Sequence, residues 1–438
     1  GRLCYAYIPA RYVFLFLASC GLFLVYAFKG FLGVAIVAMV RHKNTSTAID
    51  NECPAEDNYQ NSGHNSGEFN WDDKQQALLL GSFFYGYVIT QIPAGIAVER
   101  FGAKWMFGFS LLISGILSLL GPMCARWGQD SIVPFFITRL GQGLAQGVIL
   151  PSMNSMIAQW MPKMERSRAM SIIFAGSSLG SVVSLPLTGY LCDEPFLDGW
   201  PTIFYVLGIS ACIWFIFWSV FVFDSPDSHP FISQYEYDLI SEGQGEEKLS
   251  SKRKIPWKPM LTSYRVYAST VTHFGFNWGY LTLLTLLPTY FTNILHMNIK
   301  TVYNFAFFGT GICLIGVVLS KCDKTLSIVF FVIGLGLNGS CYSGFLANYV
   351  DMAPDFAGIL MGVTNAVGNV PGFIAPQTAS LIYSNGQTLN SWSHVFYTCS
   401  AIYFFTGIVY ILFSTSELQT WGLAKKDDKA NDNTIEKS

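Results

Sequence analysis

Two positively charged side chains stand inside long apolar stretches of the sequence. Lys29 lies within residues 14–40 and Arg139 within residues 132–160, and no Asp or Glu occupies the middle of any apolar run. A charge at the centre of a bilayer costs about 2.5–3.5 kcal/mol even on a lenient insertion scale, so such a residue normally faces a cavity or a partner. The simplest interpretation of this positive bias is a pathway for anions.

Arg139 belongs to a polar stripe on one helical face. Gln142 and Gln146 follow it by three and seven positions, so all three side chains project from the same side of a helix. The planar guanidinium fork can take two oxygens of one anion. A structural ion pair or a role at the outer gate is the alternative for Arg139.

Lys29 has aromatic candidates as neighbours. Tyr26 lies one turn before it, and Tyr87 shares a face of the next apolar helix with Gln91. These side chains could line a cavity, although aromatic residues in membranes more often pack or anchor at the interface. Lys29 lies too far from either end of its span to reach water by snorkelling.

A further polar pair stands later in the chain. His273 is the titratable group left in the middle of a span, and Asn277 follows it by one turn. His273 is a candidate for contact with substrate or protons, and a hydrogen-bonded contact between helices is its alternative role. Sodium could be held by amide oxygens. Examples of such amides in apolar spans are Asn277, Asn338, Asn365 and Asn369, and nothing in the sequence selects among them.

The composition places these residues in a membrane. The chain has 438 residues, of which 51% are hydrophobic and 12% are charged, against about 25% charged in soluble domains. About 20 apolar residues cross a hydrocarbon core as a helix, and a closed barrel of alternating strands fits such long runs less well. The sequence therefore predicts an all-α membrane protein with about 11 spans. They lie near 12–40, 76–98, 105–124, 132–160, 168–191, 202–223, 266–294, 302–320, 326–347, 358–383 and 395–414.

The charges between the spans predict the orientation, because Lys and Arg collect on the cytoplasmic side. Basic residues such as Arg11, Arg100 and Lys163 flank alternate spans, whereas the segment 41–75 is rich in acids. That segment should face outward. Its Asn44 begins a glycosylation acceptor pattern, although its closeness to the end of the first span works against modification. The net charge of −2 argues against nucleic acid as a partner.

The organisation is two groups of spans joined by a polar stretch. We expect an N-terminal bundle of six helices over 1–223, a cytoplasmic linker over 224–263, a C-terminal bundle over 264–414 and a polar tail over 415–438. The sequence around Pro162 also weakly resembles the sequence around Pro354, as expected for parallel repeats. Substrate would then sit between the two bundles.

Nothing in the sequence indicates an enzyme or a cofactor. No nucleophile-base pair and no metal cluster stand out, and the ten cysteines lack metal-ligand spacing. A disulfide between Cys53 and Cys192 in an oxidising lumen is as well supported as free thiols. No cleavable signal peptide is evident.

Longer strings of sequence resemble a known family. GSFFYGYVITQIPAGIAVERFGAKWMFG at 81–108 resembles the second helix and following loop of a major facilitator transporter. RLGQGLAQGVILPSMNSMIAQWMPKMERSRAMS at 139–171 and YVDMAPDFAGILMGVTNAVGNVPGFIAP at 349–376 narrow the resemblance to the anion:cation symporters. That group includes sialin, the vesicular glutamate transporters and the type I sodium–phosphate cotransporters, and the insect inorganic phosphate cotransporters are the most similar.

The resemblance assigns roles to residues near the cytoplasmic gate. They are the motif residues Gly95, Glu99, Arg100, Gly102 and Lys104, together with the loop residues Glu165 and Arg166. The acid and the bases of such a motif can pair with helix ends to latch the gate, while its second glycine permits a tight turn. These residues are expected to act on the gate and not on the substrate.

The resemblance also places the substrate residues and reveals departures from the family. The family's first-helix arginine falls on Lys29, which keeps the charge but loses the bidentate fork, and its fourth-helix arginine falls on Arg139. Proton-coupled vesicular members carry a Glu where this chain has Gln146, a His at Leu80 and an Arg at Phe276. Because an amide cannot relay protons, the glutamine favours the phosphate and urate branch.

One helix of the family pattern is missing from this chain. After residues 293–300 the family's eighth helix should follow, but TVYNFAFFGTGICLIG at 301–316 matches the ninth. A lost span should invert every later one or leave one uninserted. The sequence therefore also fits an exon-skipped isoform, or the product of a faulty gene model, and such a protein would be impaired in transport.

The resemblance implies a major facilitator fold that works by alternating access. The expected function is cation-coupled symport, with sodium or protons, of inorganic phosphate or a small organic anion. A carboxylate transporter for glutamate-like or sialic acid-like substrates is the alternative, and a truncated membrane protein that does not transport is the alternative of another class. The expected partners are the anion, the coupling cation and the lipid bilayer, with the plasma membrane favoured over vesicles or lysosomes.

Overall fold

The computed structural model describes most of the chain as helices. The described residues are 9–41, 67–127, 131–162, 165–193, 199–244, 257–293, 313–320, 323, 325–327, 329–330, 352, 357–384, 386–413 and 419–420. Asn44, Asn338, residues 301–312 and the polar tail after 420 lie outside this set. An isolated backbone bridge joins Val40 to Phe69. The predicted all-helical architecture agrees with every regular element in the described ranges.

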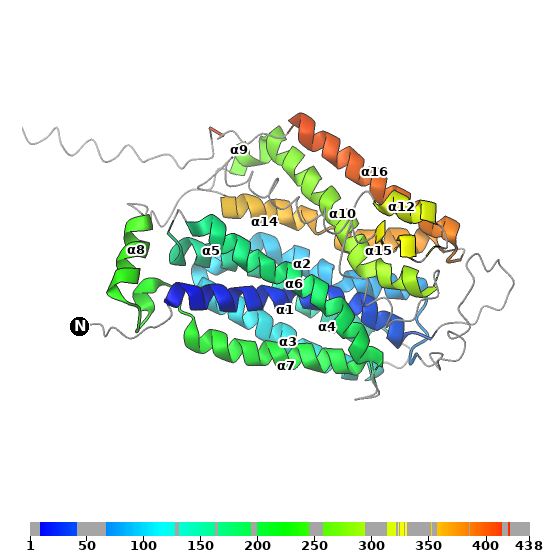
Figure 1. The fold of residues 1–438 in the computed structure, drawn as a ribbon, viewed down its shortest axis with the longest axis horizontal. Helices are drawn as coiled ribbons and strands as arrows, with labels where there is room; N and C mark the ends of the chain where they lie inside the picture. The colour runs from blue at the N-terminus through cyan, green and yellow to red at the C-terminus, as the bar shows by residue number, and fades with distance from the viewer. Residues whose placement is uncertain are drawn as a thin grey trace, which may run out of the picture.

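The first group of helices occupies the lower half of Figure 1. Its members are α1 (Ala10–Met39), α2 (Asp73–Phe101), α3 (Ala103–Trp127), α4 (Val133–Gln146), α5 (Ile149–Trp160), α6 (Arg166–Asp193) and α7 (Pro201–Phe221). A connecting region follows, with the 3₁₀ turn η3 (Pro226–Ser228), α8 (Gln234–Gln244) and α9 (Trp257–Thr262).

The second group of helices lies above the first in the same view. Its described members are α10 (Tyr264–Asn293), α12 (Cys313–Ser320), α14 (Ala357–Gly368), α15 (Pro371–Ile382) and α16 (Leu389–Phe413). The two groups meet where α1 contacts α10, α2 contacts α14 and α15, and α5 contacts α14. The predicted domain boundaries themselves stay predictions.

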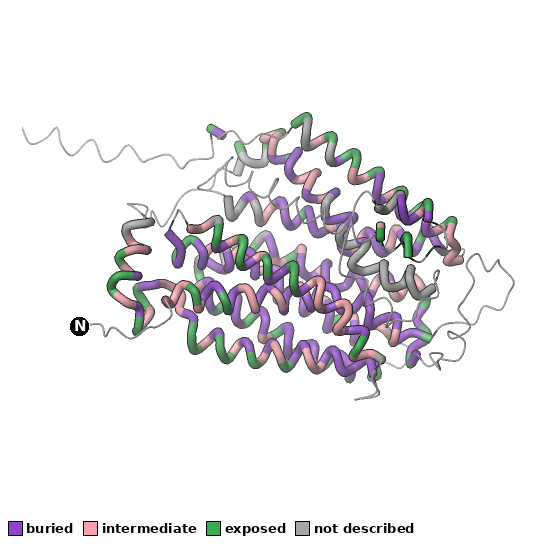
Figure 2. The backbone as a smooth tube through the Cα atoms, in the orientation of Figure 1, coloured by how far each residue is buried: buried purple, intermediate pink, exposed green. Residues whose placement is uncertain are grey.

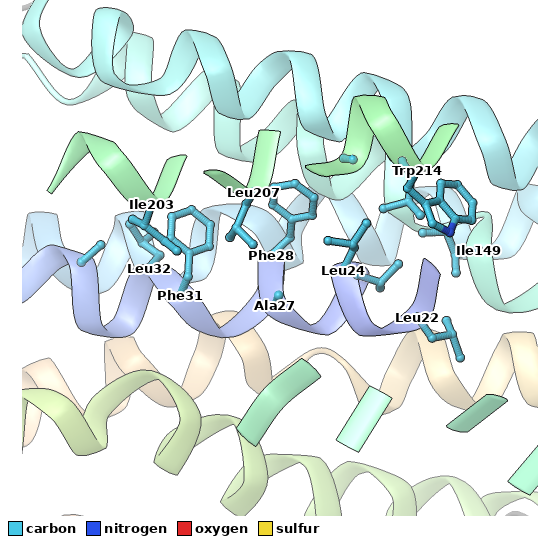
Figure 3. Packing of buried hydrophobic residues seen from close by; sticks show 14 of the residues in the cluster. Leu22, Leu24, Ala27, Phe28, Phe31, Leu32, Ile149, Ile203, Leu207 and Trp214 are labelled. Carbon is cyan, nitrogen blue, oxygen red and sulfur yellow. The ribbon is translucent and has the colours of Figure 1, made fainter. Parts of the chain in front are cut away.

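Helix α1 is the centre of the first group. Figure 3 shows its Phe28, Phe31 and Leu32 packed beside Ile203 and Leu207 of α7. On another side α1 runs along α6, where a Cβ atom on Gly176 or Gly180 would collide with the α1 backbone at Ser19 or Phe23. Small residues at this spacing allow two membrane helices to approach closely.

Two expected spans are each broken into two helices by a proline. Residues 132–160 form α4 and α5 with a break at Gly147, and residues 358–383 form α14 and α15 with a break before Pro371. Proline lacks an N–H group, and its ring collides with the carbonyl four residues earlier. For Pro151 that carbonyl belongs to Gly147, the cap residue of α4.

The outer surface of the first group is suited to lipid. On α3 the apolar side chains of Phe109, Ile113, Ile116 and Leu120 recur at helical spacing and are 40–47% exposed. Figure 2 shows such exposed positions along the outward sides of the helices, with buried ones facing inward. Four described helices are long and apolar enough to cross a membrane. They are Ala10–Met39, Ala103–Trp127, Arg168–Cys192 and Pro201–Phe221.

The two groups touch closely from the middle of α2 to the end where α1 finishes and α2 begins, which we call the far end. The ring of Tyr85 on α2 stacks on Phe373 of α15 at a centroid distance of 4.3 Å, and Gln377 donates to the Tyr85 hydroxyl. Nearer the tip, Gln387 Nε2 donates to Asp73 Oδ1 at 3.1 Å. Side chains from both groups therefore bridge the far end.

The opposite end, which we call the α8 end, is tied together by a carboxylate on α8. Glu236 accepts hydrogen bonds from the backbone N–H groups of Ala10 and Arg11, at 3.0 and 2.9 Å. The free N–H groups that begin a helix carry partial positive charge, so a carboxylate there is stabilising. Arg11 Nη1 also pairs with Glu165 at 2.7 Å.

Candidate functional site

Lys29 is held by aromatic rings in the middle of α1. Its side chain is 7% exposed, and its Nζ lies 4.2 Å from the centroid of the Tyr87 ring and 4.6 Å from that of Tyr26. An ammonium over an aromatic face gains about 2 kcal/mol when both are desolvated. The structure thus brings together three predicted site residues, Tyr26, Lys29 and Tyr87, and the lysine does not extend to the interface.

Arg139 lies on α4 and is 2% exposed. Its Nη1 donates to Gln142 Oε1 at 2.6 Å and its Nη2 donates to the backbone oxygen of Phe28 at 3.3 Å. Its guanidinium carbon lies 5.1 Å from the ring centroid of Phe31 and 5.5 Å from that of Phe83. Among the described residues its Nε has no hydrogen-bond partner.

The two cations stand over successive rings of one helix. Phe83 and Tyr87 are one turn apart on α2 and stack at a centroid distance of 5.8 Å. Arg139 lies over Phe83, and Lys29 lies over Tyr87. The α2 and α4 backbones can come this close because a Cβ on Gly143 would collide with Phe83 and Tyr87. Close packing of α2 and α4 therefore sets the relation between the cations.

No acid neutralises either cation within the part of the chain that the structure describes. The ion pairs found there join Arg11 to Glu165 and Glu236, and Arg126 to Glu68. Leaving a charge buried without a counter-charge is strongly destabilising, and ring faces offset only part of that cost. The arrangement can accept a small anion as the missing partner.

The two predicted glutamines of α4 have different roles. Gln142 accepts from Arg139 and donates its Nε2 to the backbone oxygen of Ser114 on α3 at 3.1 Å, so it positions the guanidinium. Gln146 is fully buried, and neither of its amide atoms has a partner among the described residues. Burying an unpartnered amide costs about 1–3 kcal/mol. Gln146 is therefore available to a ligand, whereas Gln142 is already engaged.

His273 and Asn277 lie on α10 of the second group, and the partners seen for them are on α14. Asn277 Nδ2 donates to the backbone oxygen of Gly368 at 2.7 Å. The His273 ring packs against the same glycine, since a Cβ there would lie 2.7 Å from His273 Cδ2. Asn369 donates to the Asn365 oxygens at 2.7 and 2.9 Å. These residues form a neutral polar region on the other half.

Comparisons with known proteins decide the family. The model of the major facilitator superfamily matches residues 15–322. Sialin from Homo sapiens is 36% identical over 94% of this chain and 91% of its own length. A proposed inorganic phosphate cotransporter from Drosophila melanogaster is 34% identical over 96% of this chain and 87% of its own.

The chain belongs to the major facilitator superfamily. Vesicular glutamate transporter 3 from Danio rerio, 32% identical over 94% of the chain and 74% of its own length, is a further relative. This protein is a transporter and not an enzyme, and the predicted resemblance to the anion:cation symporters is confirmed.

Solved structures agree on the major facilitator fold. A bacterial homologue of the human lysosomal transporter Spinster superimposes with a TM-score of 0.67, covering 93% of this chain and 97% of its own, at 10% identity. A D-xylose–proton symporter gives 0.62, covering 94% and 99%, at 13% identity. The expected major facilitator fold is thereby confirmed, while the number of about 11 spans stays a prediction.

The relatives contain segments that this major facilitator protein lacks. The alignments with sialin and with the fly protein run over 460 and 474 positions, more than the 438 residues of the whole chain. Gaps must therefore lie opposite residues of the relatives. That the missing residues form one helix, the eighth of the family pattern, stays a prediction.

The gate motif of this family member is built around a glycine turn. Gly102 has φ of +85°, a conformation that favours glycine, and it separates α2 from α3. Asp224 accepts from the backbone N–H of Lys104 at 2.9 Å, and Lys104 Nζ donates to the Ser219 oxygen at 3.1 Å. Arg100 lies exposed beside the Phe101 ring. The surroundings of the motif residues Gly95 and Glu99 lie outside the described part.

The two predicted gate-loop residues have separate partners in this transporter. Glu165 pairs with Arg11 of α1 at 2.7 Å, while Arg166 donates to the backbone oxygens of Ala158 and Met161, at 3.0 and 3.4 Å. Glu165 thus ties the segment between α5 and α6 to α1, whereas Arg166 bonds back to the end of α5. Neither lies at the cation pair.

Two aromatic side chains of the site were missed by reasoning from the sequence. Phe31 and Phe83 flank the Arg139 guanidinium, yet a phenylalanine in an apolar helix carries no distinctive signal. Only their positions in the sequence, close to predicted site residues, could have indicated them. Phe83 precedes Tyr87 by one turn, and Phe31 follows Lys29 by two residues.

Proposed function

We propose that this protein couples a cation to the transport of inorganic phosphate or a small organic anion by alternating access. The observation that carries the proposal is the pair of buried cations, Lys29 and Arg139, with ring faces and no acid as their described neighbours. An anion that enters between the halves would supply the missing counter-charge. Its release would restore the unpaired state.

Inorganic phosphate is the first choice of substrate. A tetrahedral anion can present two oxygens to the fork of Arg139 and others to the compact ammonium of Lys29. A proposed inorganic phosphate cotransporter is among the 34%-identical relatives. Small carboxylates are the second choice, because sialin and the vesicular glutamate transporters are similarly related.

The contacts at the far end support alternating access. Outward opening must separate α2 from α15 there, so it must break the Tyr85–Phe373 stack and the Gln387–Asp73 hydrogen bond. Among the described residues, these contacts carry no charge apart from that of Asp73. They can therefore form and break repeatedly during transport without exposing a buried ion pair.

The coupling cation is proposed to be sodium or a proton. Asn277 uses its Nδ2 donor on Gly368, which leaves its oxygen as the acceptor for a cation. His273 is buried beside it and is the titratable alternative. Uptake driven separately by a sodium gradient and by a pH gradient distinguishes the two ions.

The transporter is an integral membrane protein. Which cellular membrane contains it is a separate question. The expectation of a plasma-membrane location has no support from the relatives, several of which are named vesicular glutamate transporters. The membrane is therefore to be found by co-staining the tagged protein with plasma-membrane and endosomal markers.

The test is phosphate uptake into proteoliposomes with and without an inward sodium or proton gradient. The parent chain, Lys29→Ala and Arg139→Ala are compared with Arg126→Ala, which removes an exposed cation paired with Glu68. Gradient-dependent uptake that is lost in the first two variants and kept in Arg126→Ala is expected. If the parent takes up neither phosphate nor glutamate nor sialic acid, the non-transporting alternative replaces this proposal.

A further inference from the structure

Two glutamines with unused amides lie on the neighbouring helices α2 and α4. Gln91 on α2 is 2% exposed and Gln146 on α4 is fully buried. Among the described residues, the amide nitrogen and oxygen of both side chains lack hydrogen-bond partners. Four polar atoms left unused in one part of a packed bundle are unusual, because buried polar groups are normally satisfied.

The packing of α2 and α4 brings these amides to the level of Lys29. Gln91 follows Tyr87 by one turn on the same face of α2, and Tyr87 lies beneath the Lys29 ammonium. On α4, a Cβ on Gly147 would meet the Tyr87 oxygen at 2.8 Å and collide with Thr90. Gln146 precedes that glycine by one residue. Both amides thus belong to residues next to the part of α2 around Tyr87, whose ring contacts Lys29.

The chemistry of the amides differs from that of the cations. Lysine and arginine carry only donors, so they bind any anion oxygen. An amide also has a carbonyl oxygen, which can be satisfied only by a hydrogen atom. An anion without a hydrogen of its own leaves both amide oxygens unpaired, so it should bind less tightly than an anion whose O–H groups supply the missing hydrogen bonds.

We infer that Gln91 and Gln146 select anions that carry their own O–H groups, so that the site accepts hydrogen phosphate or dihydrogen phosphate and rejects fully deprotonated oxyanions. This inference rests on the proposed function and adds a basis for its substrate choice. Sulfate has the shape of phosphate but no O–H at neutral pH. Monofluorophosphate has the same charge as hydrogen phosphate, with fluorine in place of the hydroxyl.

The experiment is competition for phosphate uptake in proteoliposomes at neutral pH. In the parent chain, sulfate and monofluorophosphate should compete about tenfold or more weakly than unlabelled phosphate, since a site that binds a hydroxyl rejects an analogue without it. In Gln91→Leu and Gln146→Leu the difference should narrow to about threefold or less, because the unpaired carbonyl is gone. The matched control is Gln159→Leu, an exposed amide on α5.

The outcomes separate this inference from the proposed function. If the parent takes up phosphate and both analogues compete equally well, the selection by amides is wrong while phosphate transport stands. If the parent shows no uptake, the thermal unfolding midpoint is measured with phosphate and monofluorophosphate at equal ionic strength. A larger shift with phosphate that disappears in the leucine variants keeps the inference without transport, and equal shifts overturn it.

Folding of the variants is checked by gel filtration in detergent. Should a leucine variant fail to fold, Gln146→Ala and Gln91→Ala replace it, since they remove the same carbonyl without adding a branched side chain. The discrimination shown by the parent alone remains decisive. If the parent chain transports phosphate but sulfate and monofluorophosphate compete as well as phosphate does, the inference is overturned whatever the variants do.

Discussion

The two halves of this transporter are built around different kinds of polar residue. At the centre of the first half, α1 and α4 supply buried cations over the rings of α2. In the second half, the described residues of α10 and around the end of α14 include the amides of Asn277 and Asn369, which donate to backbone oxygens, and the buried imidazole of His273. Charge recognition is thus concentrated on one side of the interface, while these described polar residues on the other side are neutral.

This asymmetry suggests how a site between two moving bodies can keep its ligand. The cations stay fixed relative to one another because both belong to the tightly packed α1, α2 and α4. The neutral half can move without separating opposite charges, which would be costly in a low-dielectric interior. The anion would therefore stay with the first half while the second changes position.

The sharpest way to break the comparison is to remove the charges. Arg139→Ala leaves Gln142 and the anion without the guanidinium, and Lys29→Ala removes the ammonium over Tyr87. Losing one member of a buried charge pair costs about 3–5 kcal/mol, so uptake should fall by about a hundredfold or more. Initial rates in proteoliposomes measure this loss.

Arg139→Lys sharpens the same result, because it keeps the charge and loses the fork. An apparent affinity for phosphate reduced about tenfold is expected at this buried bidentate position. Unchanged affinity would show that charge alone matters and that the fork is irrelevant.

The neutral half should respond differently. Asn277→Ala leaves the Gly368 oxygen without its donor, which costs about 1–3 kcal/mol of stability. We expect a lower thermal unfolding midpoint and a changed dependence on the coupling cation, with the apparent affinity for phosphate nearly unchanged. A loss of phosphate affinity as large as that of Lys29→Ala would contradict the division of roles.

Removing a contact between the two halves should have a smaller effect on transport than removing a charge. Tyr85→Ala removes the stack on Phe373 and the hydrogen bond from Gln377. Because an aromatic pair contributes about 0.5–1.5 kcal/mol, the outward-open population should rise about three- to tenfold. A cysteine placed at Ser82 and labelled from the far end reports this change, with Ser82→Cys alone as the control.

The smallest expected effect is a pH dependence at the α8 end. The ring of His229 packs edge-on against Trp160 and Phe223, and this burial lowers its pKa below the ordinary 6.5, although nearby Glu236 raises it in part. A His with a depressed folded pKa favours folding when neutral, so stability should decrease as the pH falls below about 6.5.

Thermal unfolding midpoints from pH 8 to pH 5 check the effect of His229, for which less than about 1 kcal/mol is expected. In His229→Phe the dependence attributable to this group should vanish. An equal pH dependence in both proteins would assign it to other groups.

Much of the fold could be predicted because hydropathy reports directly on membrane helices. The expected spans 12–40 and 202–223 agree closely with Ala10–Met39 and Pro201–Phe221. The breaks at Gly147 and Asn369 could not be predicted from hydropathy, since both sides of each break are equally apolar. Expected spans 302–320 and 326–347 lie largely outside the described residues.

The site was predictable only where the chemistry was local. The spacing of Arg139 and Gln142 predicts one helical face, and the two side chains are hydrogen-bonded. The contacts of Glu165 with Arg11 and of Glu236 with the start of α1 join residues far apart in sequence. No periodicity records such pairs, so they depend on how the bundle folds.

The carboxylate that caps α1 has a consequence for biosynthesis. Ala10 and Arg11 leave the ribosome early, whereas Glu236 follows them by more than two hundred residues. The first helix can therefore enter the membrane long before its end is capped. Its final fixation would coincide with completion of the first half and would help to retain that half as an assembled unit while the second half is still being made.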